Sequence, residues 1–249
     1  MQTPKLITCI LSLLIILTGI SCKKSKNINL STIKIATVDY AYASGNMRQH
    51  YFITYDKYNN VDSISDNGGG VDTGAFSFKK FNYIGSSFTI TDQTGGIYMV
   101  DANTNGQILE VLLTDTLLMT YNGNELTNLS YKQPSSTYPY YTLTSYAYQW
   151  NNGDITCYGL SGVVDSYYYD QSRSGQEGDA LRIDNFLQYG RSYISTSHVA
   201  IEKEILGTWG EEYLYKFDAA GRISQLTKIT NQGPAPNTND TETYAYTYY

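Results

Sequence analysis

The chain has 249 residues, 26 of them Tyr, and only 16% are charged, with a formal net charge of −6. This polar, strand-favouring composition excludes a disordered chain and one that is buried in a membrane along its whole length. The acidic balance also excludes a nucleic-acid-binding protein, because nucleic-acid phosphates would be repelled.

The first 21 residues have the pattern of a signal peptide. The apolar run Leu6 to Ile20 is about 15 residues long, whereas a bilayer-spanning helix needs about 20. A small residue, Ser21, precedes Cys22 at the apolar to polar junction, which resembles a bacterial lipobox, although Gly19 stands where that motif usually has Leu. The alternative is an ordinary secretory signal in which Ser21 marks the cleavage site and Cys22 is incidental.

The lipobox resemblance implies an acylated protein held at a membrane through Cys22. It implies a thioether-linked diacylglycerol on the sulfur and a fatty acid such as palmitate on the new amino group. Residues 22–31 would then be the lipidated Cys and a polar tether. By analogy, Lys23 in place of Asp directs such a protein to the outer membrane of a Gram-negative cell, and the lack of an acidic run after Cys22 favours a periplasm-facing orientation.

From residue 32 onward the chain is expected to be a single β domain, 32–249. Aromatic and aliphatic residues recur at every second position, which places each set on one face of a strand. Examples are Tyr51, Ile53 and Tyr55; Tyr146, Tyr148 and Trp150; Tyr213, Tyr215 and Phe217; and Tyr244, Tyr246 and Tyr248. About twelve such strands are too many for a flat sheet, so we predict an all-β antiparallel meander curled into a roll or barrel-like shell.

The segments between strands share a turn pattern of Asp or Asn, a few small residues, and then Gly or Asn. It occurs at Asp56 to Asn60, Asn103 to Gly106 and Asp218 to Gly221. Asp or Asn caps a tight turn with its side chain, and Gly or Asn accepts positive φ, so these segments are predicted to be hairpins. Residues 179–189 break the rhythm and predict one short helix, which Gly190 can end.

These hairpins are similar to YD-repeat-like arrays, and the chain as a whole resembles an uncharacterised family of Bacteroidetes lipoproteins with a porin-like β fold. The resemblance is carried by Cys22, by the Ile183 to Leu187 helix, by the Tyr213 to Ile223 hairpin and by the last strand, Tyr244 to Tyr249. It implies the same curled meander. It implies no activity and carries over no catalytic residues.

Neither a cofactor nor a metal site is expected. Asp101 to Leu112 starts like a calcium loop but has Leu where the bidentate Glu would stand, so a hairpin turn is the better interpretation. The two histidines, His50 and His198, have no carboxylate or Cys at ligand spacing, and Cys157 is expected to be a small buried strand residue.

No constellation in the sequence specifies a reaction. We therefore expect a non-enzymatic binding or structural module, monomeric, whose partner is a glycan or an envelope protein. The aromatic run Tyr138, Tyr140 and Tyr141 is the candidate ligand contact, because aromatic rings can stack on sugars. The alternative is an envelope glycan hydrolase, for which the densest acidic group is the starting point: Glu202, Glu204, Glu211 and Glu212.

Overall fold

The computed structural model describes residues 34–42, 47–66, 77–112, 116–134, 141–159, 165–205, 209–232 and 240–249. All of them belong to one compact unit. The expected signal peptide, Cys22 and the tether lie outside the described residues. No helix among the described residues is long and apolar enough to cross a bilayer.

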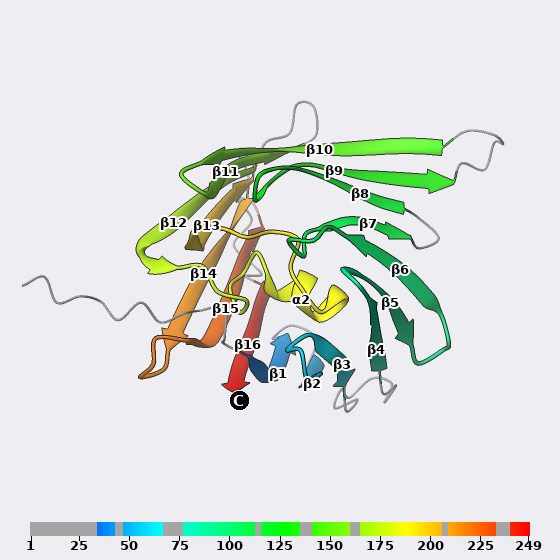
Figure 1. The fold of residues 1–249 in the computed structure, drawn as a ribbon. Coiled ribbons are helices and arrows are strands. Elements are labelled where there is room, and N and C mark those ends of the chain that lie inside the picture. The colour runs from blue at the N-terminus through cyan, green and yellow to red at the C-terminus, as the bar shows by residue number, and fades with distance from the viewer. Residues whose placement is uncertain are drawn as a thin grey trace, which may run out of the picture. The chain divides into compact units, whose positions relative to one another are not determined.

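The described residues form sixteen antiparallel strands that close into a barrel (Figure 1). Each strand pairs with the next along the chain, and β1 pairs with β16. The strands are β1 (Ile35–Tyr42), β2 (Met47–Tyr55), β3 (Val61–Asp66), β4 (Ser77–Ile84), β5 (Ser87–Asp92), β6 (Ile97–Ala102), β7 (Ile108–Leu112), β8 (Thr116–Asn122), β9 (Glu125–Pro134), β10 (Tyr141–Asn151), β11 (Asp154–Gly159), β12 (Asp165–Ser174), β13 (His198–Ile205), β14 (Trp209–Phe217), β15 (Ile223–Gln232) and β16 (Asp240–Tyr248).

The predicted all-β meander is confirmed, and the number of strands was underestimated. Strands such as β7 and β8 place aliphatic residues inside the barrel, among them Val111, Leu117 and Met119. The expectation of about twelve strands relied on alternating aromatic residues, and these short strands do not show that alternation.

The meander places the connections at two ends of the barrel. One end, here called the turn end, holds the connections 56–60, 85–86, 103–107, 123–124, 152–153, 175–197 and 218–222, and there β1 begins and β16 finishes. The opposite end, here called the loop end, holds the other connections. Apart from 175–197, every connection at the turn end is five residues or shorter.

The repeated turns at the turn end form as their sequences predict. The carboxylate of Asp218 accepts the backbone N–H groups of Ala220 and Arg222, both at 2.9 Å, and Gly221 has φ +79°. The Asp56 and Asn103 turns repeat this arrangement, with positive φ at Asn59 and Gly106. Each turn is thus determined by residues only a few positions apart.

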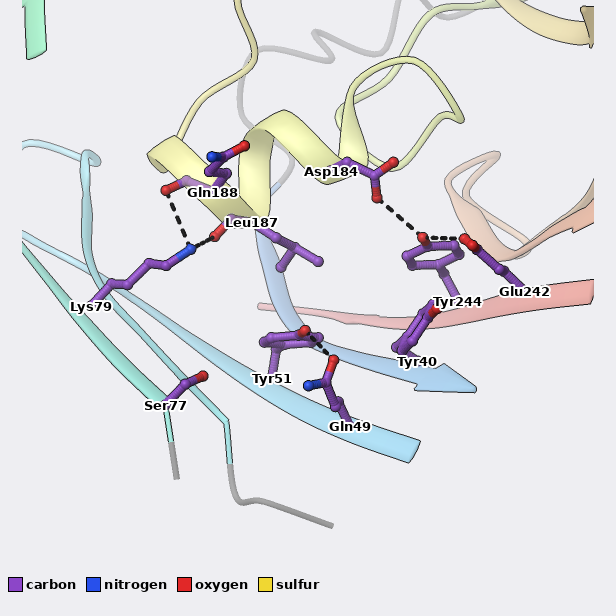
Figure 2. Close-up of a pocket in the computed structure, with 10 residues that line it drawn as sticks. All are labelled: Tyr40, Gln49, Tyr51, Ser77, Lys79, Asp184, Leu187, Gln188, Glu242 and Tyr244. Atoms are coloured by element: carbon purple, nitrogen blue, oxygen red, sulfur yellow. Dashed lines mark hydrogen bonds between the residues drawn. The ribbon is translucent and has the colours of Figure 1, made fainter. Parts of the chain in front are cut away.

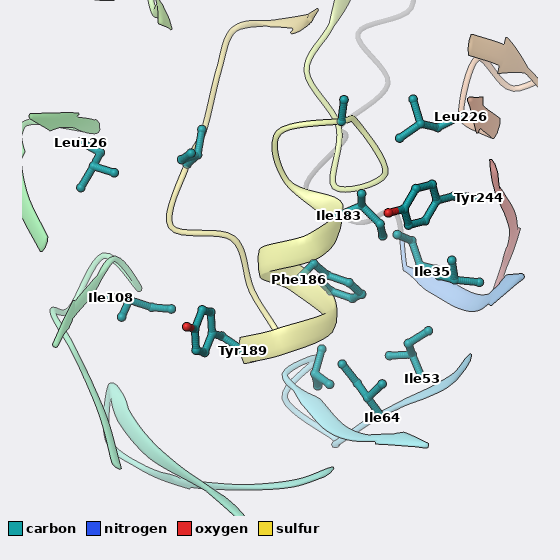
Figure 3. Packing of buried hydrophobic residues seen from close by; sticks show 14 of the residues in the cluster. Ile35, Ile53, Ile64, Ile108, Leu126, Ile183, Phe186, Tyr189, Leu226 and Tyr244 are labelled. Carbon is teal, nitrogen blue, oxygen red and sulfur yellow. The ribbon is translucent and has the colours of Figure 1, made fainter. Parts of the chain in front are cut away.

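The connection 175–197, here called the plug, lies inside the barrel and carries the one helix that the structure describes, α2 (Ile183–Tyr189) (Figure 1). Buried Phe186 and Tyr189 pack against aliphatic residues of the wall (Figure 3). Wall residues bond to the plug backbone: Tyr246 Oη donates to the carbonyl of Gly178 at 2.9 Å, and Tyr121 Oη donates to that of Tyr193 at 3.2 Å. The plug is therefore attached to the barrel wall both before and after α2.

The predicted helix exists and is shorter than 179–189. It ends at Gly190, whose φ of +70° and bond from its N–H to the Phe186 carbonyl form the predicted C-terminal cap. Its start lies at Ile183 because the Asp179 side chain accepts the N–H groups of Gln176 and Leu181 and so holds a turn there.

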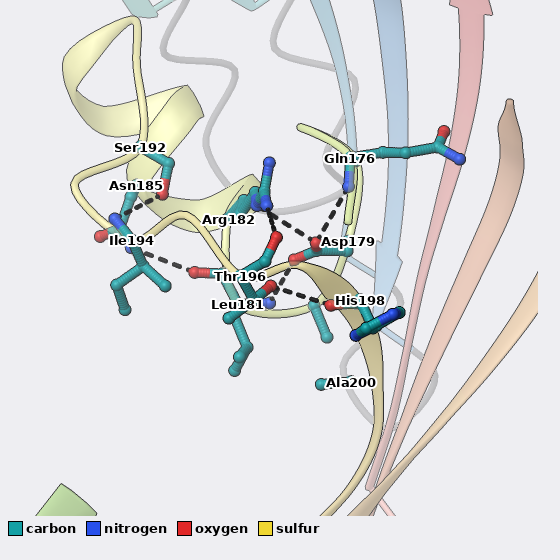
Figure 4. Close-up of polar contacts among 12 residues, drawn as sticks. Gln176, Asp179, Leu181, Arg182, Asn185, Ser192, Ile194, Thr196, His198 and Ala200 are labelled. Carbon is teal, nitrogen blue, oxygen red and sulfur yellow. Dashed lines mark hydrogen bonds and ion pairs between the residues drawn. The ribbon is translucent and has the colours of Figure 1, made fainter. Parts of the chain in front are cut away.

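Buried polar contacts fix the shape of the plug (Figure 4). Arg182 lies between the Asp179 carboxylate, 3.3 Å from its Nε, and the carbonyl of Thr196, to which it also donates. Burial raises the pKa of Asp179, and the Arg182 charge and the backbone donors oppose that rise. This pair joins the start of the plug to its end.

Candidate ligand site in the barrel lumen

A cavity of about 440 Å³ lies between α2 and the barrel wall, on the side of α2 that faces the loop end (Figure 2). Its wall is formed by α2 and by four strands near the β1–β16 junction, namely β16, β1, β2 and β4. The lining residues are Tyr40, Gln49, Tyr51, Ser77, Lys79, Asp184, Leu187, Gln188, Glu242 and Tyr244.

Three tyrosines form the aromatic part of the cavity wall. The rings of Tyr40 and Tyr244 are tilted at 53° with centroids 5.0 Å apart, and Tyr51 donates to the amide oxygen of Gln49. Burial, followed by the charges of Glu242 and Asp184, raises the pKa of Tyr40 to about 12. Burial and the nearby carboxylates likewise raise the pKa of Tyr51 to about 12 and that of Tyr244 well above its usual value. All three hydroxyls therefore remain protonated donors at neutral pH.

Two carboxylates from distant parts of the chain meet at one hydroxyl. Tyr244 Oη lies 2.8 Å from Glu242 Oε2 and 3.1 Å from Asp184 Oδ1, and its single hydrogen serves one of them at a time. Asp184 also receives a bond from Lys228 Nζ at 2.7 Å. The two carboxylate oxygens are consequently at most about 6 Å apart, an upper limit that includes the roughly 5 to 5.5 Å of paired carboxylates in retaining glycosidases.

The Lys79 side chain lines the cavity away from the two carboxylates, and its ammonium group bonds to backbone carbonyls of α2. Lys79 Nζ donates to the carbonyl oxygens of Leu187 at 3.1 Å and Gln188 at 3.5 Å, at the C-terminal end of α2. Those carbonyls have no partner within the helix, so a cation there is favourable. Burial lowers the pKa of Lys79.

None of the four glutamates expected for a hydrolase lines this cavity. Glu202 and Glu212 lie opposite each other in the β13–β14 pair and are exposed, and exposed Glu204 accepts a bond from Tyr168. Glu211 accepts a bond from Tyr213 Oη. Of the candidate ligand contacts, Tyr138 and Tyr140 lie outside the described residues, and Tyr141 begins β10 at the loop end without a described side chain.

The residues that form the cavity were not expected from the sequence. Asp184 lies within the predicted helix, and Glu242 lies two positions before Tyr244 and so on the same face of its strand. The alternation along this strand could therefore have predicted that Glu242 faces the barrel interior. The proximity of Glu242 to Asp184 depends on where the plug folds back into the barrel. No local sequence pattern predicts that position.

The remaining candidates have structural partners. His50 pairs with Asp39, and His198 Nδ1 lies 2.7 Å from Asp154 Oδ2. Asn103 bonds to the backbone of its own turn between β6 and β7, so the calcium-like segment is the predicted hairpin. Within the described ranges there is no group of three or more His, Cys, Asp or Glu that could hold a metal ion.

Similar architectures occur among solved structures. No protein-family model and no curated protein matches the chain. A porin-like protein from Bacteroides uniformis superposes with a TM-score of 0.63 at 12% identity, over 86% of this chain and 96% of that one. A porin-like protein from Bacteroides vulgatus gives 0.56, also at 12% identity, over 86% of this chain and 98% of that one.

The chain has a porin-like fold. This agrees with the fold implied by the sequence resemblance, and at this identity the likeness concerns the fold alone.

Proposed function

We propose that this protein is a non-enzymatic lipoprotein of the cell envelope that binds a small, hydroxyl-rich ligand such as a glycan inside its barrel. The lumen cavity of about 440 Å³ carries the proposal, because small-molecule sites usually measure about 300 to 1,000 Å³. Tyr rings give stacking surfaces, and the Gln49 amide and the carboxylates can bond to sugar hydroxyls.

Calorimetric titration with a panel of oligosaccharides, including fragments of peptidoglycan, tests this role. Gln49→Ala removes a cavity amide and should weaken binding about tenfold, since a polar group that bonded to the ligand is lost. Gln149→Ala makes the same change at an exposed position of β10 and should leave binding unchanged. Equal effects of the two variants would contradict a lumen site.

The second part of the proposal is attachment to the outer membrane through a lipid on Cys22, with the barrel facing the periplasm as a monomer. The outer face of β16 supports an anchor of this kind, whereas β4 and β6 carry exposed apolar side chains, among them Ile84, Ile97 and Met99. Along β16 the positions between the inward tyrosines are Thr243, Ala245 and Thr247, whereas a lipid-facing wall needs an apolar band about 25 Å tall. Labelled palmitate should enter the wild type and not Cys22→Ala, and equal labelling would refute the anchor.

An envelope glycan hydrolase is the alternative, and the Asp184–Glu242 pair is the observation that favours it. A glycosidase needs two carboxyl groups in one cavity as acid and nucleophile, and these two meet at the Tyr244 hydroxyl. The purified protein should release no sugar from polysaccharides or peptidoglycan under the preferred proposal. Release that Glu242→Gln abolishes would establish the hydrolase instead.

The ligand could extend beyond the cavity to the loop end. Tyr138 and Tyr140 precede β10, Tyr141 begins it, and the three remain the proposed additional contacts there. The proposed membership of a Bacteroidetes lipoprotein family with YD-repeat-like hairpins is consistent with the Asp-capped turns described above.

A further inference from the structure

The two carboxylates and the two lysines around the lumen cavity do not all form ion pairs with one another. Asp184 is paired with Lys228, and Lys79 is bound to the carbonyl groups at the end of α2. Glu242 is half-buried and accepts a bond from the neutral Tyr244 hydroxyl. Lys228 lies opposite Glu242 in the β15–β16 pair, but its Nζ bonds to Asp184, and no ion pair joins Glu242 to a Lys or Arg of the described chain. A carboxylate in this position is stabilised by an incoming cation.

Two tyrosine rings, those of Tyr40 and Tyr244, line the cavity together with Glu242. Lys228 Nζ already lies 5.0 Å from the centroid of the Tyr244 ring, a cation–π distance. The adjacent Tyr40 ring has no cation over it among the described residues, and it lines the same cavity as Glu242. Burial raises the pKa of Tyr40 first, and the charges of Glu242 and Asp184 raise it further, as expected when carboxylates lie near this ring.

We propose that the lumen cavity binds a primary ammonium group between the Glu242 carboxylate and the Tyr40 ring, and that its ligand is an amino sugar with a free amine. This inference rests on the proposed glycan-binding role and narrows it to one class of sugar. An ammonium donates to the carboxylate and contacts the ring, while the hydroxyls of the sugar bond to Gln49 and Tyr51. An N-acetylated sugar of the same shape lacks the charge and forms neither ionic contact.

The test compares two trisaccharides that differ only in acetylation. The full-length protein in detergent is titrated calorimetrically at about pH 6, where the amine is protonated, with the glucosamine trimer and with the N-acetylglucosamine trimer. We expect the free amine to bind about tenfold more tightly, with a preference that weakens as salt is added.

Glu242→Gln should abolish the preference for the amine. It keeps the side-chain shape and an oxygen that can accept the Tyr244 bond, so the fold should survive, which the thermal midpoint verifies. Tyr40→Leu should reduce the preference as well. Glu204→Gln, which neutralises an exposed carboxylate of β13 outside the cavity, is the matched control and should have no effect.

The other outcomes distinguish failure of the ammonium site from failure of the glycan-binding role. Equal binding of both trimers, unaffected by Glu242→Gln, would overturn the ammonium site and leave the glycan-binding role in place. Putrescine serves as a probe with amines and no hydroxyls. Binding of putrescine that depends on Glu242, with no binding of either trimer, would support the ammonium site and refute the glycan. No binding of any of the three would refute both.

Discussion

Two glycines, Gly123 and Gly153, lie in two-residue turns and have positive φ. Replacing each by Ala distinguishes the cost of backbone strain alone from the cost of strain combined with a steric collision. Gly123 has φ +60° with open space where a Cβ would be, whereas Gly153 has φ +81° and its Cβ would lie 2.2 Å from Ser197 Oγ at the end of the plug. Gly123→Ala should lower the free energy of unfolding by about 1 to 2 kcal/mol, the cost of a left-handed conformation with a Cβ.

Gly153→Ala should cost more, because the Ser197 side chain must also move away from the new Cβ. Urea unfolding measures both variants. In the Ser197→Ala background the excess cost of Gly153→Ala should fall, since the colliding oxygen is gone. Equal costs for the two single variants would show that the plug does not press on this turn.

Asp92 should make stability depend on pH in the acid range. Its carboxylate accepts bonds from Tyr98 Oη at 2.6 Å, from Thr94 Oγ1 at 2.7 Å and from two backbone N–H groups, and these bonds lower its pKa to about 2. The unfolded value is about 3.9. A depressed pKa adds stability that is fully present above the unfolded value and is lost as the pH falls toward 2.

The comparison that isolates Asp92 is the wild type against Asp92→Asn. The difference in urea midpoint should be constant above about pH 5 and shrink between about pH 4 and 2. A difference that does not change with pH would show that these bonds do not depend on the charge.

For single residues, the sequence predicts those that form the turns but not those that line the cavity. Asp218 and its N–H partners are two and four positions apart, so their pattern is visible in a short window. Tyr244 and Asp184 are 60 positions apart, and their contact forms only when the barrel has closed around the plug. Local patterns cannot contain that information.

Among the elements, α2 should contribute strongly to stability through its buried face. Ile183 is fully buried, whereas Ile201 on β13 is 39% exposed. Ile183→Ala should cost about 2 to 5 kcal/mol of unfolding free energy, because it removes packed atoms and leaves a cavity. Ile201→Ala is the same chemical change and should cost less than about 1 kcal/mol. Similar losses in both would mean that the plug packs loosely.

The elements rich in aromatic residues were the most predictable. The sets in β10, β14 and β16 alternate as expected, and Tyr213, Tyr244 and Tyr246 are buried. The aliphatic strands β7 and β8 and the start of α2 were not well predicted. Their patterns are short, and the Asp179 turn competes with the helix through its own side chain.

For the whole molecule, the β1–β16 seam is the pairing with the longest chain between its partners. Thr37 Oγ1 and Thr247 Oγ1 lie 2.8 Å apart across this seam, and Thr54 Oγ1 and Ser63 Oγ lie 2.7 Å apart across the β2–β3 hairpin. In a background lacking Cys157, replacing the first pair by cysteines should add about 5 kcal/mol of stability when oxidised.

The hairpin pair is the control and should add only about 2.5 kcal/mol, since a short loop loses less entropy on closure. Urea unfolding of the oxidised and reduced forms measures both values. A larger gain from the hairpin pair would indicate that the seam is already closed in the unfolded ensemble or is strained by the bond.

The pairing of β1 with β16 also sets the order of events when the protein is made. The strand β1 leaves the ribosome before the other fifteen, has β2 on one side and must wait for β16 on the other. Until then the growing sheet presents two open edges, which are templates for pairing with other chains. Premature termination before residue 240 would leave those edges exposed for good, so incomplete chains of this protein should aggregate where the complete chain does not.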